Sequence, residues 1–169
     1  MKKKIIITIS WILVAIWMGI IYSFSNVKGE ESTNDSRKII EKTIEKTVET
    51  TNKTGITNTN PSKKEIKQVS KSLDYPFRKA MHIFVYFVLS ILTLNALYQS
   101  GVKKLKLFII AFIICFIYSL TDEYHQLFRE RTGEFKDCLI DGIGIIIGLI
   151  FYKIGLNIYN KKRKNIKSN

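Results

Sequence analysis

Ionisable and amide side chains gather in one short stretch of the sequence, residues 120–148, which joins two apolar segments. Most of them lie at the end of the first segment or at the beginning of the second. The whole set is Asp122, Glu123, His125, Gln126, Arg131, Asp137 and Asp141. A charge at such a place is expensive to bury, so it is usually paired, hydrated or functional. Carboxylates beside histidine can carry acid–base chemistry, and arginine can bind an anionic group.

A second set of polar side chains begins an earlier apolar segment: Arg78, Lys79, His82 and Tyr86. Arg78, His82 and Tyr86 are spaced i, i+4, i+8, which places them on one helix face. Tyr118, Asp122 and His125 share a face in the same way, as do Asp137 and Asp141. We therefore predict that three helices present polar stripes at one end of a bundle, with Arg78, Lys79 and Arg131 nearly balancing four carboxylates.

The elements that position these residues are four apolar blocks, at about 5–24, 80–98, 105–121 and 139–159. About 20 apolar residues in a helix match the thickness of a bilayer core. The runs are continuous rather than alternating, which favours helices over a β-barrel. The predicted fold class is all-α: a polytopic membrane protein with four transmembrane helices, forming a single domain over residues 1–169.

Charge distribution predicts the orientation of this domain. The chain has 27 Lys and Arg residues and a net charge of +13. Lysines follow the N-terminal Met, occupy the connection 99–104 and fill the C-terminal tail, three places on one side of a four-span protein. The positive-inside rule predicts cytoplasmic N- and C-termini in a bacterial plasma membrane. Because the basic residues flank apolar runs, we interpret them as topology signals and expect no nucleic-acid partner.

The long first connection, 26–78, then lies outside and is predicted to contain short amphipathic helices. Ile40, Ile44 and Val48 recur every four residues, which indicates a helix over 35–49, followed by a loop over 50–61. Ser62 and Glu65 match a capping box that begins a second short helix. We expect that helix to end before Pro76, since proline disfavours helix in the residue before it.

Several other features can be explained without a specific function. Cys115 and Cys138 are expected at different depths, which argues against a disulfide. Two histidines and several carboxylates suit a divalent metal, but no HExxH or comparable spacing is present. We therefore predict no metal and no cofactor. Gly144 and Gly148 form a small-xxx-small pair, which is either a close helix contact or the usual glycine content of membrane helices.

Three blocks of the sequence resemble the VanZ-like family, small multi-pass membrane proteins associated with teicoplanin resistance. They are Tyr22-Ser23-Phe24-Ser25; Arg78-Lys79-Ala80-Met81-His82 with Tyr86; and Asp122-Glu123-Tyr124-His125-Gln126 with Arg131, Asp137, Asp141 and the glycines through Gly148. The blocks span about residues 22–148. The resemblance implies an envelope-facing site and an involvement in reduced susceptibility to lipoglycopeptides. It implies no reaction.

Three functional hypotheses follow. In the first, the polar site engages an envelope amphiphile: a membrane lipid head group, a lipid-linked cell-wall precursor or a lipoglycopeptide. In the second, the chain is an integral-membrane enzyme in which Asp122 or Asp141 acts with His125 on a lipid-linked substrate. In the third, the charges only join helices in a structural or accessory subunit. The sequence leaves the enzyme question and the oligomeric state open.

Overall fold

The computed structural model describes residues 2–27, 29–127 and 135–168, and these are helical apart from short connections. The described residues contain no strand, which confirms the all-α prediction. The helices are α1 (Lys2–Ser25), α2 (Gly29–Lys53), α3 (Lys63–Gln99), α4 (Lys104–Leu127) and α5 (Phe135–Ser168).

Four of these helices, α1, α3, α4 and α5, are long and apolar enough to cross a membrane. They correspond to the four predicted apolar blocks, although α3 and α5 extend well beyond them. Many large apolar side chains point outward from the bundle; Leu105 is 70% exposed and Phe151 is 61% exposed. An apolar exterior of this extent suits contact with lipid rather than with water.

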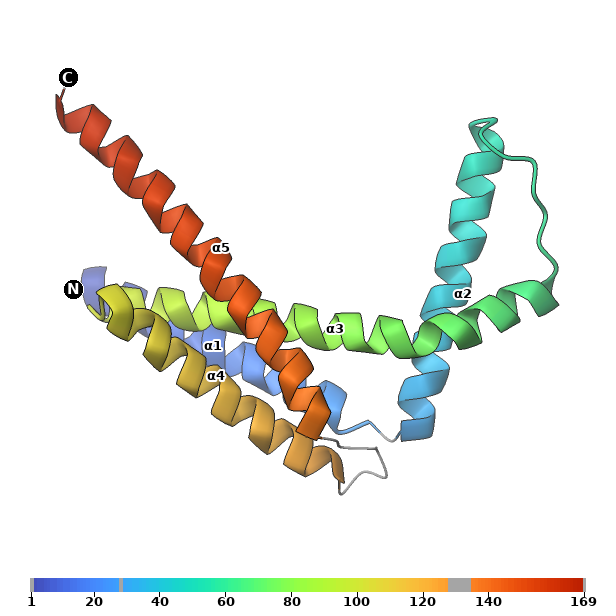
Figure 1. Ribbon diagram of the computed structural model, residues 1–169, viewed down its shortest axis with the longest axis horizontal. Helices are drawn as coiled ribbons and strands as arrows, with labels where there is room; N and C mark the ends of the chain where they lie inside the picture. Colours follow the sequence, from blue (N-terminus) through green and yellow to red (C-terminus); the bar gives the residue numbers. More distant parts are fainter. Residues whose placement is uncertain (1, 28, 128–134, 169) are drawn as a thin grey trace.

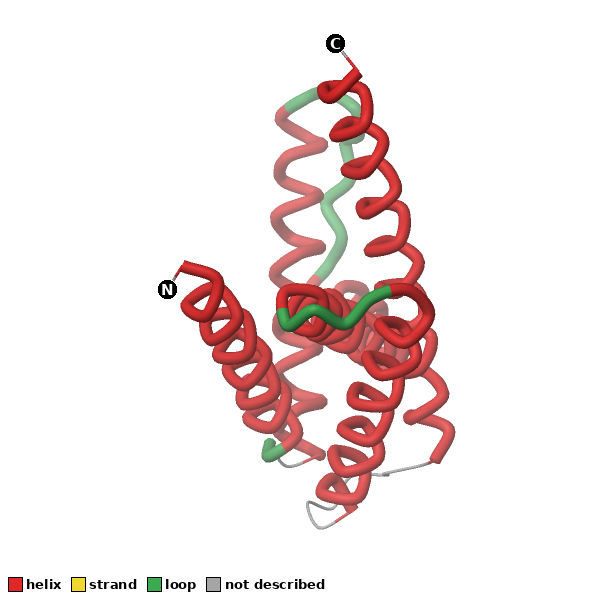
Figure 2. Tube along the Cα trace, turned by 90° about the vertical axis from the view of Figure 1, so that its left-hand side faces the viewer, coloured by secondary structure: helices red, strands yellow, loops and turns green. Residues whose placement is uncertain are grey.

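Helix α3 lies in the middle of the molecule and contacts each of the other four helices (Figures 1 and 2). Its most extensive contact is with α5, and two glycines of α5 explain why. A Cβ on Gly144 would lie 2.3 Å from the carbonyl oxygen of Ile83, and one on Gly148 would lie 2.8 Å from that of Phe87. Only a residue without a side chain permits such a close approach of two helix backbones.

Two apolar clusters hold the bundle together. One includes Val14, Leu89 and Ile145, from α1, α3 and α5. The other lies near the end of α3 and the beginning of α4 and is built on Leu94, Leu97, Leu107 and Ala111. The second cluster therefore lies at the end of the bundle that holds the N-terminus of α1, where Trp11 packs against it.

The first half of α3 projects beyond the bundle and packs on α2 (Figure 1). Here the predicted helix end before Pro76 is wrong, because α3 continues through Pro76 as one helix from Lys63 to Gln99. An internal proline costs about 3 kcal/mol. Contacts to α2 on both sides of Pro76 offset this cost: Asp74 accepts a hydrogen bond from Ser36, and Arg78 donates one to Thr33.

Helix α2 is longer than predicted, since it begins at Gly29 rather than at residue 35 and ends at Lys53. Ile40 from the predicted apolar stripe is buried, while Ile39 beside it is exposed. The capping box is confirmed: Ser62 accepts from the backbone N–H of Glu65, whose carboxylate accepts from Ser62. The absence of a disulfide is also confirmed, because Cys115 and Cys138 are both free and buried.

Candidate functional site

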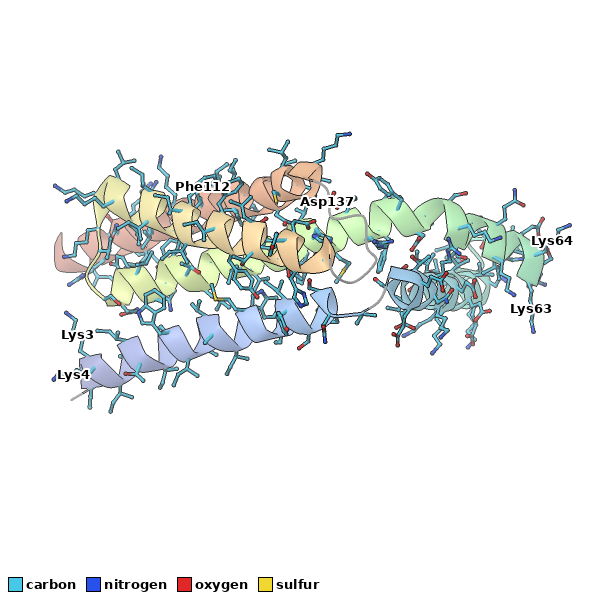
Figure 3. The ribbon with its side chains drawn as sticks, turned by 90° about the horizontal axis from the view of Figure 1, so that it is seen from below. Lys3, Lys4, Lys63, Lys64, Phe112 and Asp137 are labelled. Atoms are coloured by element: carbon cyan, nitrogen blue, oxygen red, sulfur yellow. The ribbon has the colours of Figure 1, made fainter. Side chains whose placement is uncertain are left out.

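The end of α4, the beginning of α5 and the middle of α3 bring polar side chains together at one end of the bundle. Figure 3 shows Asp137 at this end, far along the bundle from Lys3 and Lys4. We call this group the polar cluster: Lys79, His82, Asp122, Glu123, Gln126, Asp137 and Asp141. Its four carboxylates are buried, with Asp141 fully inaccessible and Asp122 and Glu123 each 5% exposed.

Helices α3 and α5 are joined in the cluster by two ionisable pairs. Lys79 of α3 forms an ion pair with Asp137 of α5. One turn further along both helices, His82 Nδ1 lies 3.0 Å from Asp141 Oδ1. Asp141 also accepts a hydrogen bond of 2.7 Å from the Ser119 hydroxyl of α4. A spacing of three residues in α3 and of four in α5 keeps each pair of side chains on one helix face, which lets both pairs form side by side.

Helix α4 contributes carboxylates whose hydrogen bonds are incomplete. The Gln126 amide donates to Asp122 Oδ2 at 3.1 Å and to Glu123 Oε1 at 3.4 Å. Glu123 Oε2 is buried and has no hydrogen-bond partner among the described residues, and the same holds for the Tyr86 hydroxyl. Buried polar atoms normally find a partner, so a water molecule, an ion or a ligand would be needed to satisfy these two.

The other predicted site residues that the structure describes lie around the cluster. The His125 ring lies beside that of Tyr22, tilted by 42° with ring centroids 4.7 Å apart, so this histidine faces α1. The histidine that Asp141 contacts is therefore His82, which corrects the suggested pairing of Asp141 with His125. Arg78 reaches α2 and donates to Thr33 Oγ1 at 3.2 Å rather than pairing with a carboxylate of the cluster. Arg131 lies outside the described residues.

Sequence reasoning did not single out Ser119. The signal was weak but present, because Ser119 precedes Asp122 by three residues and therefore shares its helix face. What the sequence could not supply was the partner, since Asp141 comes from another helix.

A cavity of about 550 Å³ opens beside the polar cluster, between α2 and the adjoining parts of α1, α3 and α4. Its apolar wall includes Ile21, Phe24, Ile39, Phe77, Met81 and Val85. Lys38, Lys42 and Arg78 line it as cations, and Asp35 lines it as an anion 3.5 Å from Lys38. His82, Tyr86, Asp122 and Gln126 line it as polar or ionisable groups from the bundle. The cavity is thus amphipathic, with an apolar wall, a basic part and a polar part.

Three side chains of the cluster offer atoms that can hold a metal ion. A nitrogen of His82 and a carboxylate oxygen from each of Glu123 and Asp141 all lie within 4.8 Å of one another. The three residues come from α3, α4 and α5, so no local motif in the sequence could have revealed them. The prediction that the chain binds no metal was made from motifs alone.

Four membrane-spanning helices that enclose a polar cluster at one end define a multi-pass membrane protein. The family model VanZ/LLP1 matches residues 10–156, which include every residue of the polar cluster and of the cavity. The chain therefore belongs to the VanZ/LLP1 family, and the family resemblance drawn from the three sequence blocks is confirmed. Comparison with curated proteins and with solved structures gives no match.

Proposed function

We propose that this protein binds an anionic amphiphile of the bacterial cell envelope in the cavity beside the polar cluster. The ligand class comprises membrane lipid head groups, lipid-linked cell-wall precursors and lipoglycopeptides. Binding of this kind in the plasma membrane would lower teicoplanin susceptibility, as the family resemblance implies.

The observation that carries the proposal is the composition of the cavity. Its apolar wall suits an acyl or prenyl chain, and its cations suit a phosphate or carboxylate. Arg78 is central to this view. Among the described residues its Nη1 donates one hydrogen bond, to the Thr33 hydroxyl, and its buried Nε has no hydrogen-bond partner. A guanidinium with spare donors favours an anionic head group.

The proposed orientation places the cavity on the outer face of the membrane and both termini in the cytoplasm. The arrangement of the helices supports it, because the N-terminus, the C-terminus and the α3–α4 connection lie away from the cluster (Figure 1). These three lysine-rich places can then all meet the cytoplasmic leaflet. The cavity would lie at the level of the outer head groups, where the ligand class is found.

A photoreactive alkyl phosphate tests the proposal on the purified full chain in detergent. We expect it to label cavity residues and an alkyl phosphocholine of equal chain length to compete poorly. Arg78→Gln should weaken labelling about 10-fold or more, as expected for loss of a charge-assisted hydrogen bond. Lys64→Gln removes an exposed charge of α3 outside the cavity and serves as the matched control.

Equal labelling of wild type and Arg78→Gln, or equal competition by both amphiphiles, would refute an anion-specific site. The cellular counterpart is teicoplanin susceptibility of a Gram-positive host expressing the same three proteins at matched membrane levels. Protection by wild type and Lys64→Gln, with loss in Arg78→Gln, is the expected pattern.

A second candidate function is catalysis on a lipid-linked substrate by the same site. The hydrogen-bonded series Ser119–Asp141–His82 favours it, because a carboxylate that holds an imidazole is a common arrangement for acid–base chemistry. His82 also lines the cavity. Turnover of a lipid-linked substrate by purified wild type, lost in His82→Gln and kept in His125→Gln, would distinguish an enzyme from a binding protein.

A further inference from the structure

Helices α3, α4 and α5 each direct one potential metal ligand to the same point of the polar cluster. We propose that His82, Glu123 and Asp141 bind one divalent transition-metal ion, Mn²⁺ or Zn²⁺. This inference replaces the motif-based expectation of no metal. It does not depend on the proposed amphiphile binding.

The distances suit a metal site. The three donor atoms lie within 4.8 Å of one another. Ligand atoms about 2.0–2.2 Å from an ion are at most about 4.4 Å apart, when they lie on opposite sides of it. Neighbouring ligands of one ion lie closer together, about 3–3.6 Å apart, so side-chain rotations that move the donor atoms by about an ångström bring all three into one coordination sphere.

Glu123 supplies an independent observation that points to a ligand. Glu123 is only 5% exposed, and its Oε2 has no hydrogen-bond partner among the described residues. Leaving a buried carboxylate oxygen without a donor is costly. A metal ion among the three donors would satisfy that oxygen, which nothing else in the described part of the chain does.

The charges of the cluster also favour a cation. Asp137 has Lys79 as its partner, and Asp141 has His82. When both are ionised, the carboxylates of Glu123 and Asp141 together carry two negative charges, which one divalent ion would balance. Buried charges in proteins are normally paired or bound to metal, and here the second arrangement fits.

The type of ligand selects the type of metal. Ca²⁺ and Mg²⁺ prefer sites made wholly of oxygen atoms, whereas imidazole suits transition metals. One imidazole with two carboxylates therefore favours Mn²⁺ or Zn²⁺. The cavity beside His82 leaves room for water or another oxygen ligand to complete the coordination sphere.

The test uses the full chain in detergent, produced with an affinity tag that contains no histidine. The protein is stripped with EDTA, equilibrated with Mn²⁺, Zn²⁺, Mg²⁺ or Ca²⁺ in turn, desalted, and its metal content is measured. We expect wild type to retain about one Mn²⁺ or Zn²⁺ per chain and to unfold at a higher temperature when it is loaded.

Glu123→Gln should weaken this affinity by about 100-fold or more, because it removes a ligand while keeping the shape of the side chain. Asp74→Asn is the matched control, since Asp74 is a buried carboxylate outside the triad that is held by Ser36 and Arg37. Gel filtration and circular dichroism identify any variant that fails to fold.

Glu123→Cys keeps the test decisive even if Glu123→Gln does not fold. A thiolate at this position would give bound Co²⁺ an intense sulfur-to-metal absorption band that wild type lacks. Retention of no metal by wild type, retention of Mg²⁺ or Ca²⁺ alone, or equal affinity in wild type and Glu123→Gln would overturn the proposal. None of these outcomes affects labelling by the alkyl phosphate at Arg78, so the two proposals fail separately.

Discussion

The two ends of this helical bundle are built on different principles. At the end near the N-terminus, Leu94, Leu97, Leu107 and Ala111 form an apolar cluster in which each residue is at most 6% exposed. At the other end, the same helices α3, α4 and α5 bury four carboxylates, and a Glu123 oxygen lacks a hydrogen bond. The first end resembles an ordinary protein core, and the second does not.

This difference indicates which end of the bundle stabilises the fold and which end could serve a function. Apolar packing lowers the free energy of the folded state, whereas buried ionised groups raise it unless they are paired well. A sequence selected only for a stable bundle has no reason to place Asp122, Glu123 and Asp141 inside it. The apolar end therefore stabilises the fold, and the polar end is the part of the bundle that the proposed binding functions would use.

The largest effect is expected from breaking the ion pair of the polar end. Lys79→Met leaves Asp137 buried without its cation and should lower the free energy of unfolding by about 3–5 kcal/mol. The double variant Lys79→Met/Asp137→Leu removes both charges and should recover most of that loss. Thermal unfolding in detergent with EDTA measures both, with Lys64→Met as the control for losing an exposed lysine. If the double variant is no more stable than Lys79→Met, the ion pair itself stabilises the fold.

The apolar end should behave in the opposite way. Leu94→Ala removes a fully buried side chain and should cost about 2–4 kcal/mol of unfolding free energy through the cavity left behind. Labelling by the alkyl phosphate, measured well below the unfolding temperature, should stay unchanged. Ile154→Ala truncates an apolar residue that is 52% exposed and should cost far less. Loss of labelling in Leu94→Ala would break the proposed division between the two ends.

A smaller effect on stability, but a selective one, is expected where α5 meets α3 beside the polar cluster. Gly144→Ala places a methyl group against the Ile83 carbonyl oxygen and should cost about 1–3 kcal/mol. Because Gly144 follows Asp141 by one turn, separating the helices should also disturb the contact of Asp141 with His82 and weaken metal retention.

Gly142→Ala is the matched control for this contact, since a Cβ there meets no atom within 4 Å. Alanine is the better helix former, so this control should be neutral or stabilising by up to about 1 kcal/mol. Equal behaviour of the two alanine variants would show that the close approach at Gly144 does not position the cluster.

Much of the fold could be predicted because it depends on local properties. The four membrane-spanning helices follow from apolar runs whose length matches a bilayer, and the beginning of α3 follows from Ser62 and Glu65. The polar stripes follow from the helical repeat, which placed Arg78, His82 and Tyr86 on one face. Each of these inferences uses residues close together in the sequence, where helix geometry alone fixes the relation between side chains.

Partners across helices were decided only by the tertiary structure. Proline at position 76 favours a helix end, yet contacts with α2 on both sides of it keep α3 continuous. The sequence contains two histidines, His82 and His125, either of which could contact Asp141. The close approach of α5 to α3 at Gly144 is accompanied by the contact of Asp141 with His82, while His125 faces α1. The register between helices depends on such backbone contacts, which no local pattern encodes, and that register brings His82, Glu123 and Asp141 to one point.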